Sequence, residues 1–242
     1  MAGRELPPTS PFAGDDGRAD PGVAAALAAY GAGTGALTDV VAALAGTRVL
    51  VPVLAELEVA ETVVHGGHEH TVDKEASAGI VALQAPDGRT ALPAFTSTDA
   101  LARWRTQARP VPTGVERAAL SAVQEGWELM VVDPGGPVTA LVPRPAMWAL
   151  AQGRAWLPAV DGDRVDDAVR AAVVAALTPI GEVVAADAVP GGRAEVAVVV
   201  TLVGGLDRDA LDVVLARINA ALAGDPTVAD RVDGLELRLR AA

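Results

Sequence analysis

The stretch Leu92-Pro93-Ala94-Phe95-Thr96-Ser97-Thr98-Asp99-Ala100-Leu101-Ala102-Arg103-Trp104 predicts a short strand that runs into a capped helix with almost no loop. Leu92–Phe95 is a brief apolar run, and Pro93 restricts it to a strand start, an edge or a bulge. Thr96 is the expected N-cap, because its hydroxyl can accept from a free backbone N–H of the first turn, and Ser97 is the rival cap.

The helix after this strand is expected over residues 97–107. Asp99 stands three residues after Thr96, where its carboxylate can answer the N-cap N–H and favour the positive end of the helix dipole. Leu101 and Trp104 are three residues apart and share one helix face. That face is expected to pack on the core while the opposite face stays in solvent.

The composition indicates a globular chain whose core is built mainly from small side chains. Hydrophobic residues make up 51% of the 242 residues, but aromatic residues only 3%, so Ala and Val must fill most of the interior. The net charge of −12 disfavours a surface that tracks nucleic-acid phosphates, so no nucleic-acid partner is expected. The chain has no cysteine, which excludes disulfides, thiolate catalysis and cysteine-ligated metals.

No targeting or membrane segment is predicted. Residues 1–12 contain three prolines and no apolar run typical of a signal peptide. The longest strongly apolar stretch, Val196–Leu206, is too short to span a bilayer. We therefore expect a cytoplasmic protein with no membrane partner.

Periodicity and turn residues predict a mixed order of helices and strands in the first 154 residues. Helices are expected near 21–30, 37–45, 97–107, 114–125 and 146–152, and strands near 48–54, 78–84, 89–95, 127–132 and 137–142. Pro86-Asp87-Gly88 and Asp133-Pro134-Gly135-Gly136 each predict a hairpin turn. Pro110 and Pro112 are expected to stop the helix that begins near residue 97. Residues 1–20, rich in Pro, Gly and Asp, predict a disordered tail.

A second pattern begins after Arg154. It consists of a helix at 163–177, strands at 182–188 and 194–203, a helix at 207–222, a short turn or helix at 226–231 and a strand at 235–239. This order needs no contribution from the first 150 residues, so a domain boundary is placed near Arg154. The predicted fold class is α+β, with two small mixed-sheet domains, 21–154 and 155–242, each with helices packed on its sheet.

The best-placed candidate site combines residues from two turns, and we call it the compound site. If the strands ending at Phe95 and Val132 run parallel, the turns that follow them meet at one end of the sheet, where ligands of α/β sheets tend to bind. The candidate binding residues at that end are Thr96, Ser97, Thr98, Trp104, Asp133 and Gly135, with Gly136 beside them. The alternative is that these residues are only the caps and turn residues that the fold requires.

All three histidines lie in the stretch His65-Gly66-Gly67-His68-Glu69-His70. Three imidazoles with Glu69 or Asp73 could hold a divalent ion. No helix fixes the ligands at an i, i+4 spacing, however, so His65, His68 and His70 are weak metal candidates, with adventitious affinity the alternative. No cofactor is predicted, because the glycine-rich stretch 31–35 follows a helix and lacks the GxGxxG spacing of a dinucleotide loop. No catalytic residue is predicted, because the chain has no G-x-S-x-G nucleophile motif.

Three segments together resemble the SseB family, best known from the enhanced serine sensitivity protein of bacteria. They are Val49-Leu50-Val51-Pro52-Val53, Leu92 through Ser97 with Leu101 and Trp104, and Leu129 through Gly135. The similarity covers about residues 20–150, the N-terminal domain of the family. Residues 160–242 resemble the C-terminal domain through the order of elements, and the Ala- and Val-rich composition resembles actinobacterial members. The resemblance implies a fold but supplies no catalytic residue.

Two functions are carried forward. The first is a non-enzymatic protein-binding or regulatory module, since the predicted sheets have proline-marked edges that could accept or exclude a partner strand. The alternative is a small-ligand or anion-binding protein, possibly an enzyme, that uses the sheet end near Thr96–Thr98 and Asp133–Gly136. Structural self-association is a third possibility.

Overall fold

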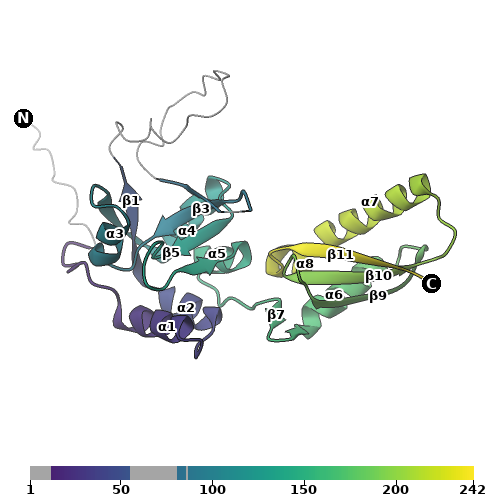
Figure 1. Cartoon of the computed structure of the whole chain (residues 1–242), viewed down its shortest axis with the longest axis horizontal. Coiled ribbons are helices and arrows are strands. Elements are labelled where there is room, and N and C mark those ends of the chain that lie inside the picture. Colours follow the sequence, from purple (N-terminus) through teal and green to yellow (C-terminus); the bar gives the residue numbers. More distant parts are fainter. Residues whose placement is uncertain (1–11, 55–80, 86) are drawn as a thin grey trace, which may run out of the picture. The chain divides into compact units, whose positions relative to one another are not determined.

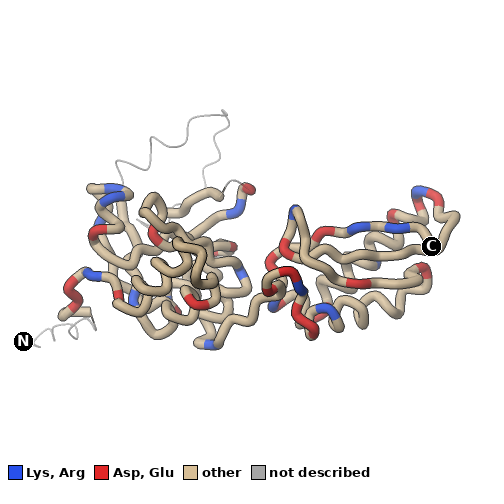
Figure 2. The backbone as a smooth tube through the Cα atoms, turned by 60° about the horizontal axis from the view of Figure 1, so that its bottom comes forward, with Lys and Arg blue, Asp and Glu red and all other residues tan. Residues whose placement is uncertain are grey.

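The computed structural model describes residues 12–54, 81–85 and 87–242, which form two compact units (Figure 1). The N-terminal unit comprises Met1–Val142 with Leu150–Arg154, and the C-terminal unit comprises Pro143–Ala149 with Ala155–Ala242. The histidine stretch, with its weak metal candidates, lies outside the described residues. Figure 2 shows acidic residues along both units, with basic residues interspersed among them.

The N-terminal unit contains two sheets and the helices around them. Its elements are α1 (Pro21–Gly31), α2 (Leu37–Leu44), β1 (Arg48–Val53), β2 (Leu83–Gln84), β3 (Thr90–Ala94), α3 (Thr98–Trp104), β4 (Arg109–Gly114), α4 (Val115–Gln124), β5 (Leu129–Val132), β6 (Ala140–Val142) and α5 (Arg144–Ala151), which is divided between the units. The larger sheet has the order β2-β3-β5-β6, and β1 pairs with β4 in the smaller one. An antiparallel bridge between Leu50 and Phe95 links the two sheets.

The central pair of the larger sheet confirms the predicted arrangement. β3 and β5 run parallel, with Ala94 opposite Val132, while β2 and β6 are antiparallel to their neighbours, as expected for the two predicted hairpins. Phe95 is fully buried directly after β3. The turns after β3 and β5 therefore lie at the same end of the sheet.

The expected role of Pro110 and Pro112 was wrong. Helix α3 already ends at Trp104, and both prolines lie inside β4, where they pair with Pro52 and Leu50 of β1. A strand with a single neighbour needs only half of its backbone groups for pairing, so prolines are tolerated there although they lack an N–H.

Residues 12–20, the described part of the predicted tail, contain turns held by aspartate side chains. Backbone N–H groups of Gly17 and Arg18 are held by the carboxylates of Asp15 and Asp16, and Asp20 caps α1 by accepting from Gly22 and Val23. We call residues 15–18 the N-terminal strap. In this described part, the aspartates that contributed to the predicted disorder supply turn and cap groups.

The C-terminal unit contains a three-stranded sheet, a two-stranded hairpin and three helices of its own among the described residues. Its elements are β7 (Val160–Asp161), β8 (Arg164–Val165), α6 (Asp167–Leu177), β9 (Val183–Pro190), β10 (Val196–Leu202), α7 (Arg208–Gly224), α8 (Pro226–Arg231) and β11 (Leu235–Ala241). The sheet has the order β11-β10-β9, with β10 parallel to β11 and antiparallel to β9 (Figure 1).

Alternate residues of β10 carry the core of this unit. Val196, Val198 and Val200 are buried in one cluster with residues of α6, α7 and α8. Asp207 caps α7 as expected, but α6 begins four residues later than predicted, because residues 160–165 form the β7–β8 hairpin and Asp166 is the cap. Both units together confirm the α+β class.

Among the described residues, no helix has the length and apolar character needed to cross a membrane.

Candidate functional site

The two turns of the compound site, one after β3 and one after β5, are in direct contact. The Thr96 N–H donates to Asp133 Oδ1 over 2.8 Å, and the Thr96 hydroxyl donates to Asp133 Oδ2 over 2.7 Å. Both residues are buried, and Asp133 is 8% exposed. The carboxylate therefore ties the turn after β5 to the end of β3.

The backbone of Asp133 is itself unusual. Its φ is +49°, the only positive value for a non-glycine residue in the described part of the chain. Its carbonyl accepts from the Gly136 N–H and the Thr139 hydroxyl, both over 3.0 Å. Asp is among the few side chains that tolerate this left-handed region, which explains an aspartate at the start of the turn.

Burial raises the pKa of Asp133 above its usual range. The two hydrogen bonds from Thr96 act in the opposite direction, as does the positive charge of Arg103. A buried carboxyl with a raised pKa in a sheet-end turn is a pattern that often marks a functional site. Here both oxygens already accept hydrogen bonds from Thr96, so the Asp133 carboxyl has a structural role.

Ser97, not Thr96, is the N-cap of α3, which corrects the expected assignment. The Ser97 hydroxyl accepts from the Ala100 N–H over 3.1 Å. The Thr96 hydroxyl is instead directed at Asp133, to which it donates. The next residue, Thr98, is also engaged, since its N–H donates to the Gly17 carbonyl over 2.8 Å and its hydroxyl donates to the same oxygen over 3.2 Å.

Arg48 and Asp15 complete this site, and the sequence reasoning missed both. The Arg48 guanidinium forms a two-bond ion pair with Asp15, with distances of 2.5 and 2.9 Å, and also donates to the carbonyls of Thr96 and Arg18. The Asp15 pKa is lowered, mainly by the hydrogen bond from Arg48. No local pattern signals this pair, because Asp15 and Arg48 are separated by α1 and α2.

Trp104 and Gly135 pack beside the same turn. The Trp104 ring lies 5.2 Å from the Phe95 ring, and the Arg105 guanidinium lies 4.9 Å from the Trp104 centroid. A Cβ on Gly135 would lie 3.8 Å from Trp104 Cδ1. All six candidate residues are thus brought to one end of the sheet, where the side chains of the polar ones are engaged by the chain itself.

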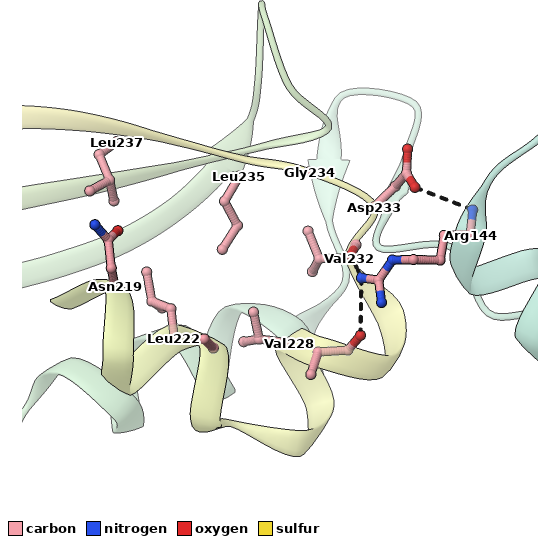
Figure 3. A pocket seen from close by; sticks show the side chains of 11 residues that line it. Arg144, Asn219, Leu222, Val228, Val232, Asp233, Gly234, Leu235 and Leu237 are labelled. Carbon is pink, nitrogen blue, oxygen red and sulfur yellow. Dashed lines mark hydrogen bonds between the residues drawn. The ribbon is translucent and has the colours of Figure 1, made fainter. Parts of the chain in front are cut away.

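A different hollow lies in the C-terminal unit. It measures about 390 Å³, and Figure 3 shows its lining. The lining residues are Arg144, Asn219, Leu222, Ala223, Val228, Ala229, Val232, Asp233, Gly234, Leu235 and Leu237. We call this hollow the α7–β11 groove. The alternating leucines of β11 were its only signal in the sequence.

One end of the α7–β11 groove is polar and internally bonded. The Arg144 N–H donates to Asp233 Oδ1 over 3.2 Å, and the Arg144 guanidinium donates to the carbonyls of Ala229 and Val232 (Figure 3). The rest of the groove is mainly aliphatic. Such a lining suits an apolar side chain of a partner better than a charged metabolite.

No group of three or more His, Asp or Glu residues in the described part of the chain could hold a metal ion. The weak candidates His65, His68 and His70 are not among those residues.

A comparison with known protein families gave a match that covers the candidate site at the sheet end. The family described as SseB protein N-terminal domain matches residues 23–149, slightly more than half of the 242 residues. The chain therefore belongs to the SseB family. The matched region contains β3, α3, β5 and the Thr96–Asp133 contact. Neither the curated proteins nor the solved structures gave a match in the other two comparisons.

Proposed function

We propose that this SseB-family chain is a cytoplasmic, non-enzymatic protein-binding module, and that its C-terminal unit supplies the docking surface. Residues 155–242 are taken in this proposal as the C-terminal domain of the family, and the chain as an actinobacterial type. The observation that carries the proposal is the outer edge of β11, which pairs with β10 on one side only and lies beside the aliphatic α7–β11 groove.

The edges of the N-terminal unit are poor docking sites by comparison. The outer strands of its larger sheet, β2 and β6, have only two and three residues. In the smaller sheet, β4 contains Pro110 and Pro112, and β1 contains Pro52. Short strands and prolines are the usual means by which proteins block pairing with another chain.

β11 is neither short nor interrupted by proline. It runs for seven residues without proline, and Leu239 is 42% and Leu235 36% exposed. Main-chain hydrogen bonds along such an edge provide affinity for an incoming strand, and neighbouring pockets for alternate side chains provide selectivity. The α7–β11 groove is such a pocket, because Leu235 and Leu237 line it.

Site-specific photo-crosslinking tests this proposal. A photo-crosslinking amino acid placed at Leu239 is expected to yield a discrete protein adduct in cells of the native host. The same amino acid at Val213, which is 60% exposed on α7, is the matched control and is expected to yield none. Equal labelling from both positions, or no adduct from Leu239, would contradict the proposal.

The alternative of anion or small-ligand binding at the sheet end has less support. A ligand there would have to displace the bonds between Thr96 and Asp133 or those between Thr98 and Gly17. A thermal-shift screen with phosphates, nucleotides and amino acids is expected to be flat. A shift that Thr98→Val abolishes would revive this alternative.

A further inference from the structure

The hydrogen bonds of β11 define which of its backbone groups are free for a partner. The Val196 N–H donates to the Gly234 carbonyl, and the Ala242 N–H donates to the Leu202 carbonyl. The backbone N–H and C=O of one residue point to the same edge of a strand, and the edge changes from each residue to the next. The backbone groups of the even-numbered residues of β11 therefore point towards β10. The outward-facing backbone groups belong to Leu235, Leu237, Leu239 and Ala241.

The other edge of this sheet is less open. β9 ends at Pro190, is contacted by β8, and has a register irregularity in its pairing where Thr201 gives way to Leu202. These features interrupt a regular edge. Strand addition to the C-terminal sheet is therefore expected at β11 (Figure 1).

We propose that the partner of β11 is a second copy of this chain, and that two β11 strands pair antiparallel with Leu237 opposite the partner's Leu237. This inference rests on the proposed protein-binding function and names its partner. The pairing is isologous, with a twofold axis through the two Leu237 residues, and it joins two three-stranded sheets into one continuous sheet.

Charge and apolar character match in this register. Glu236 lies opposite the partner's Arg238, and Arg238 opposite the partner's Glu236, so both charged pairs are complementary. On the other face, Leu235 lies opposite the partner's Leu239. Opposite charges and apolar pairs directly across an antiparallel pair are stabilising, whereas like charges are destabilising.

The neighbouring registers are worse. A pairing centred on Glu236 would place two glutamates opposite each other, and one centred on Arg238 would place two arginines opposite each other. A pairing centred on Leu239 would place Arg238 opposite the partner's Arg240. Centring on Leu237 avoids all of these contacts and makes the outward-facing leucines the hydrogen-bonded pairs of the ladder.

The charged face is already ordered within one chain. Glu236 accepts from the Gly192 and Arg193 N–H groups, both over 3.1 Å, and from the Arg238 guanidinium over 2.5 and 3.0 Å. Two copies would bring two glutamates and two arginines into one row of alternating charge. The side chains are held in place before pairing, so little conformational entropy is lost when a partner arrives.

The apolar face gives the pairing its hydrophobic contribution. Leu235 and Leu239 are large aliphatic side chains that remain partly exposed in one chain. In the proposed register the partner's Leu239 lies against Leu235, at the rim of the α7–β11 groove (Figure 3). Self-association would thus cover the groove edge that a single chain leaves open.

Sedimentation over a concentration series tests the proposal with the full chain. We expect a monomer–dimer equilibrium that Leu239→Pro abolishes. The Leu239 N–H points outward, so proline removes a bond to the partner without removing one to β10. Far-UV circular dichroism and the melting temperature establish that the variant is folded.

A charge-reversal pair tests the register without a proline. Arg238→Glu replaces two attractive pairs by two repulsive ones and is expected to weaken the dimer roughly tenfold or more. Arg240→Glu is the matched control on the same face, and it lies opposite Gly234 of the partner subunit, so the dimer is expected to persist. Loss of the dimer with Arg240→Glu but not with Arg238→Glu would overturn the register.

Cross-linking provides an independent readout, because the chain has no cysteine. In the variant Leu237→Cys, the new thiol is expected to be joined to its copy by a short bis-maleimide, whereas in Val184→Cys, on β9, it is not. A monomer at every concentration would overturn self-association, and so would a dimer that survives both Leu239→Pro and Arg238→Glu. In either case an adduct with another protein from position 239 would leave the protein-binding function standing.

Discussion

Asp133 is buried, has a raised pKa and sits in a turn at the end of a sheet, yet its contacts are those of a structural residue. One residue, Thr96, donates hydrogen bonds to both of its oxygens, from its backbone N–H and from its hydroxyl. A buried carboxyl that is fully bonded by its own chain stabilises the local backbone, whereas an unbonded one would be a strong candidate for chemistry.

Thr96→Val is expected to lower the free energy of unfolding by about 1.5–3 kcal/mol, because it removes a hydroxyl that donates to a buried carboxyl. Thr113→Val is the matched control, since the Thr113 hydroxyl bonds only the Val111 carbonyl at an exposed site, and a change within about 0.5 kcal/mol is expected there. Urea unfolding measures both. Equal effects from the two variants would show that the Thr96–Asp133 contact has no special weight.

The lowered pKa of Glu236 predicts that the free energy of unfolding depends on pH. Hydrogen bonds from the Gly192 N–H and from Arg238 lower its pKa from 4.5 to about 2. A carboxyl with a lowered pKa in the folded state contributes stability above its unfolded pKa, and that contribution is lost as the pH falls from about 4.5 towards 2. The difference in unfolding free energy between the wild type and Glu236→Gln is therefore expected to be large at pH 6 and to shrink towards pH 3. A difference that is constant over this range would contradict the assignment.

At the scale of elements, the N-terminal strap covers the first residue of α3 by accepting hydrogen bonds from it. Gly17 supplies the carbonyl that accepts from Thr98, and Asp15 is held by Arg48. The strap therefore occupies backbone groups that would otherwise be available to a ligand. The short connection between β3 and α3 is covered by a segment about eighty residues earlier in the chain.

Gly17→Ala is expected to loosen the strap. Gly17 has a φ of +76°, and a Cβ there would lie 2.8 Å from Thr98 Cγ2. The left-handed backbone alone costs a non-glycine residue about 1–2 kcal/mol. Gly14→Ala is the control, because nothing lies within 4 Å of its Cβ position.

Limited proteolysis near residue 17 is expected to be faster in Gly17→Ala than in wild type and unchanged in Gly14→Ala. If both variants are cut at the wild-type rate, the strap does not depend on the close approach of Gly17 to Thr98.

At the scale of the whole molecule, the C-terminal unit has a buried cluster made of its own residues. The buried cluster of the C-terminal unit runs from Ala159 to Val232 and includes residues of the sheet and of α6, α7 and α8. Since a unit with its own core can fold alone, residues 155–242 are proposed to be an independent domain.

A fragment of residues 155–242 is accordingly expected to unfold cooperatively in a thermal melt. Val198→Asp, which would place a charge in its buried cluster, is the control for a fragment that has lost its core. A wild-type fragment whose far-UV circular dichroism shows no cooperative transition would contradict the domain division.

Much of the fold was predictable because its signals are local. The strand–helix junction at 92–104, the turns at Pro86-Asp87-Gly88 and Asp133-Pro134, and the cap of α7 at Asp207 depend on neighbouring residues only. That the turns after β3 and β5 lie at one end of the sheet was predictable for the same reason, since the two strands run parallel. Where two local signals competed, as at Thr96 and Ser97, the sequence could not choose between them.

By itself, the sequence determined the α+β class, the order of most elements and the place where the turns of β3 and β5 meet, because periodicity and turn chemistry act over a few residues. Tertiary structure alone decided that Thr96 bonds Asp133, that Arg48 holds the strap, and that the prolines of β4 lie in a strand. It also decided which side of β11 is open. Each of these depends on pairing between distant segments, and no local pattern encodes which distant group will complete a hydrogen bond.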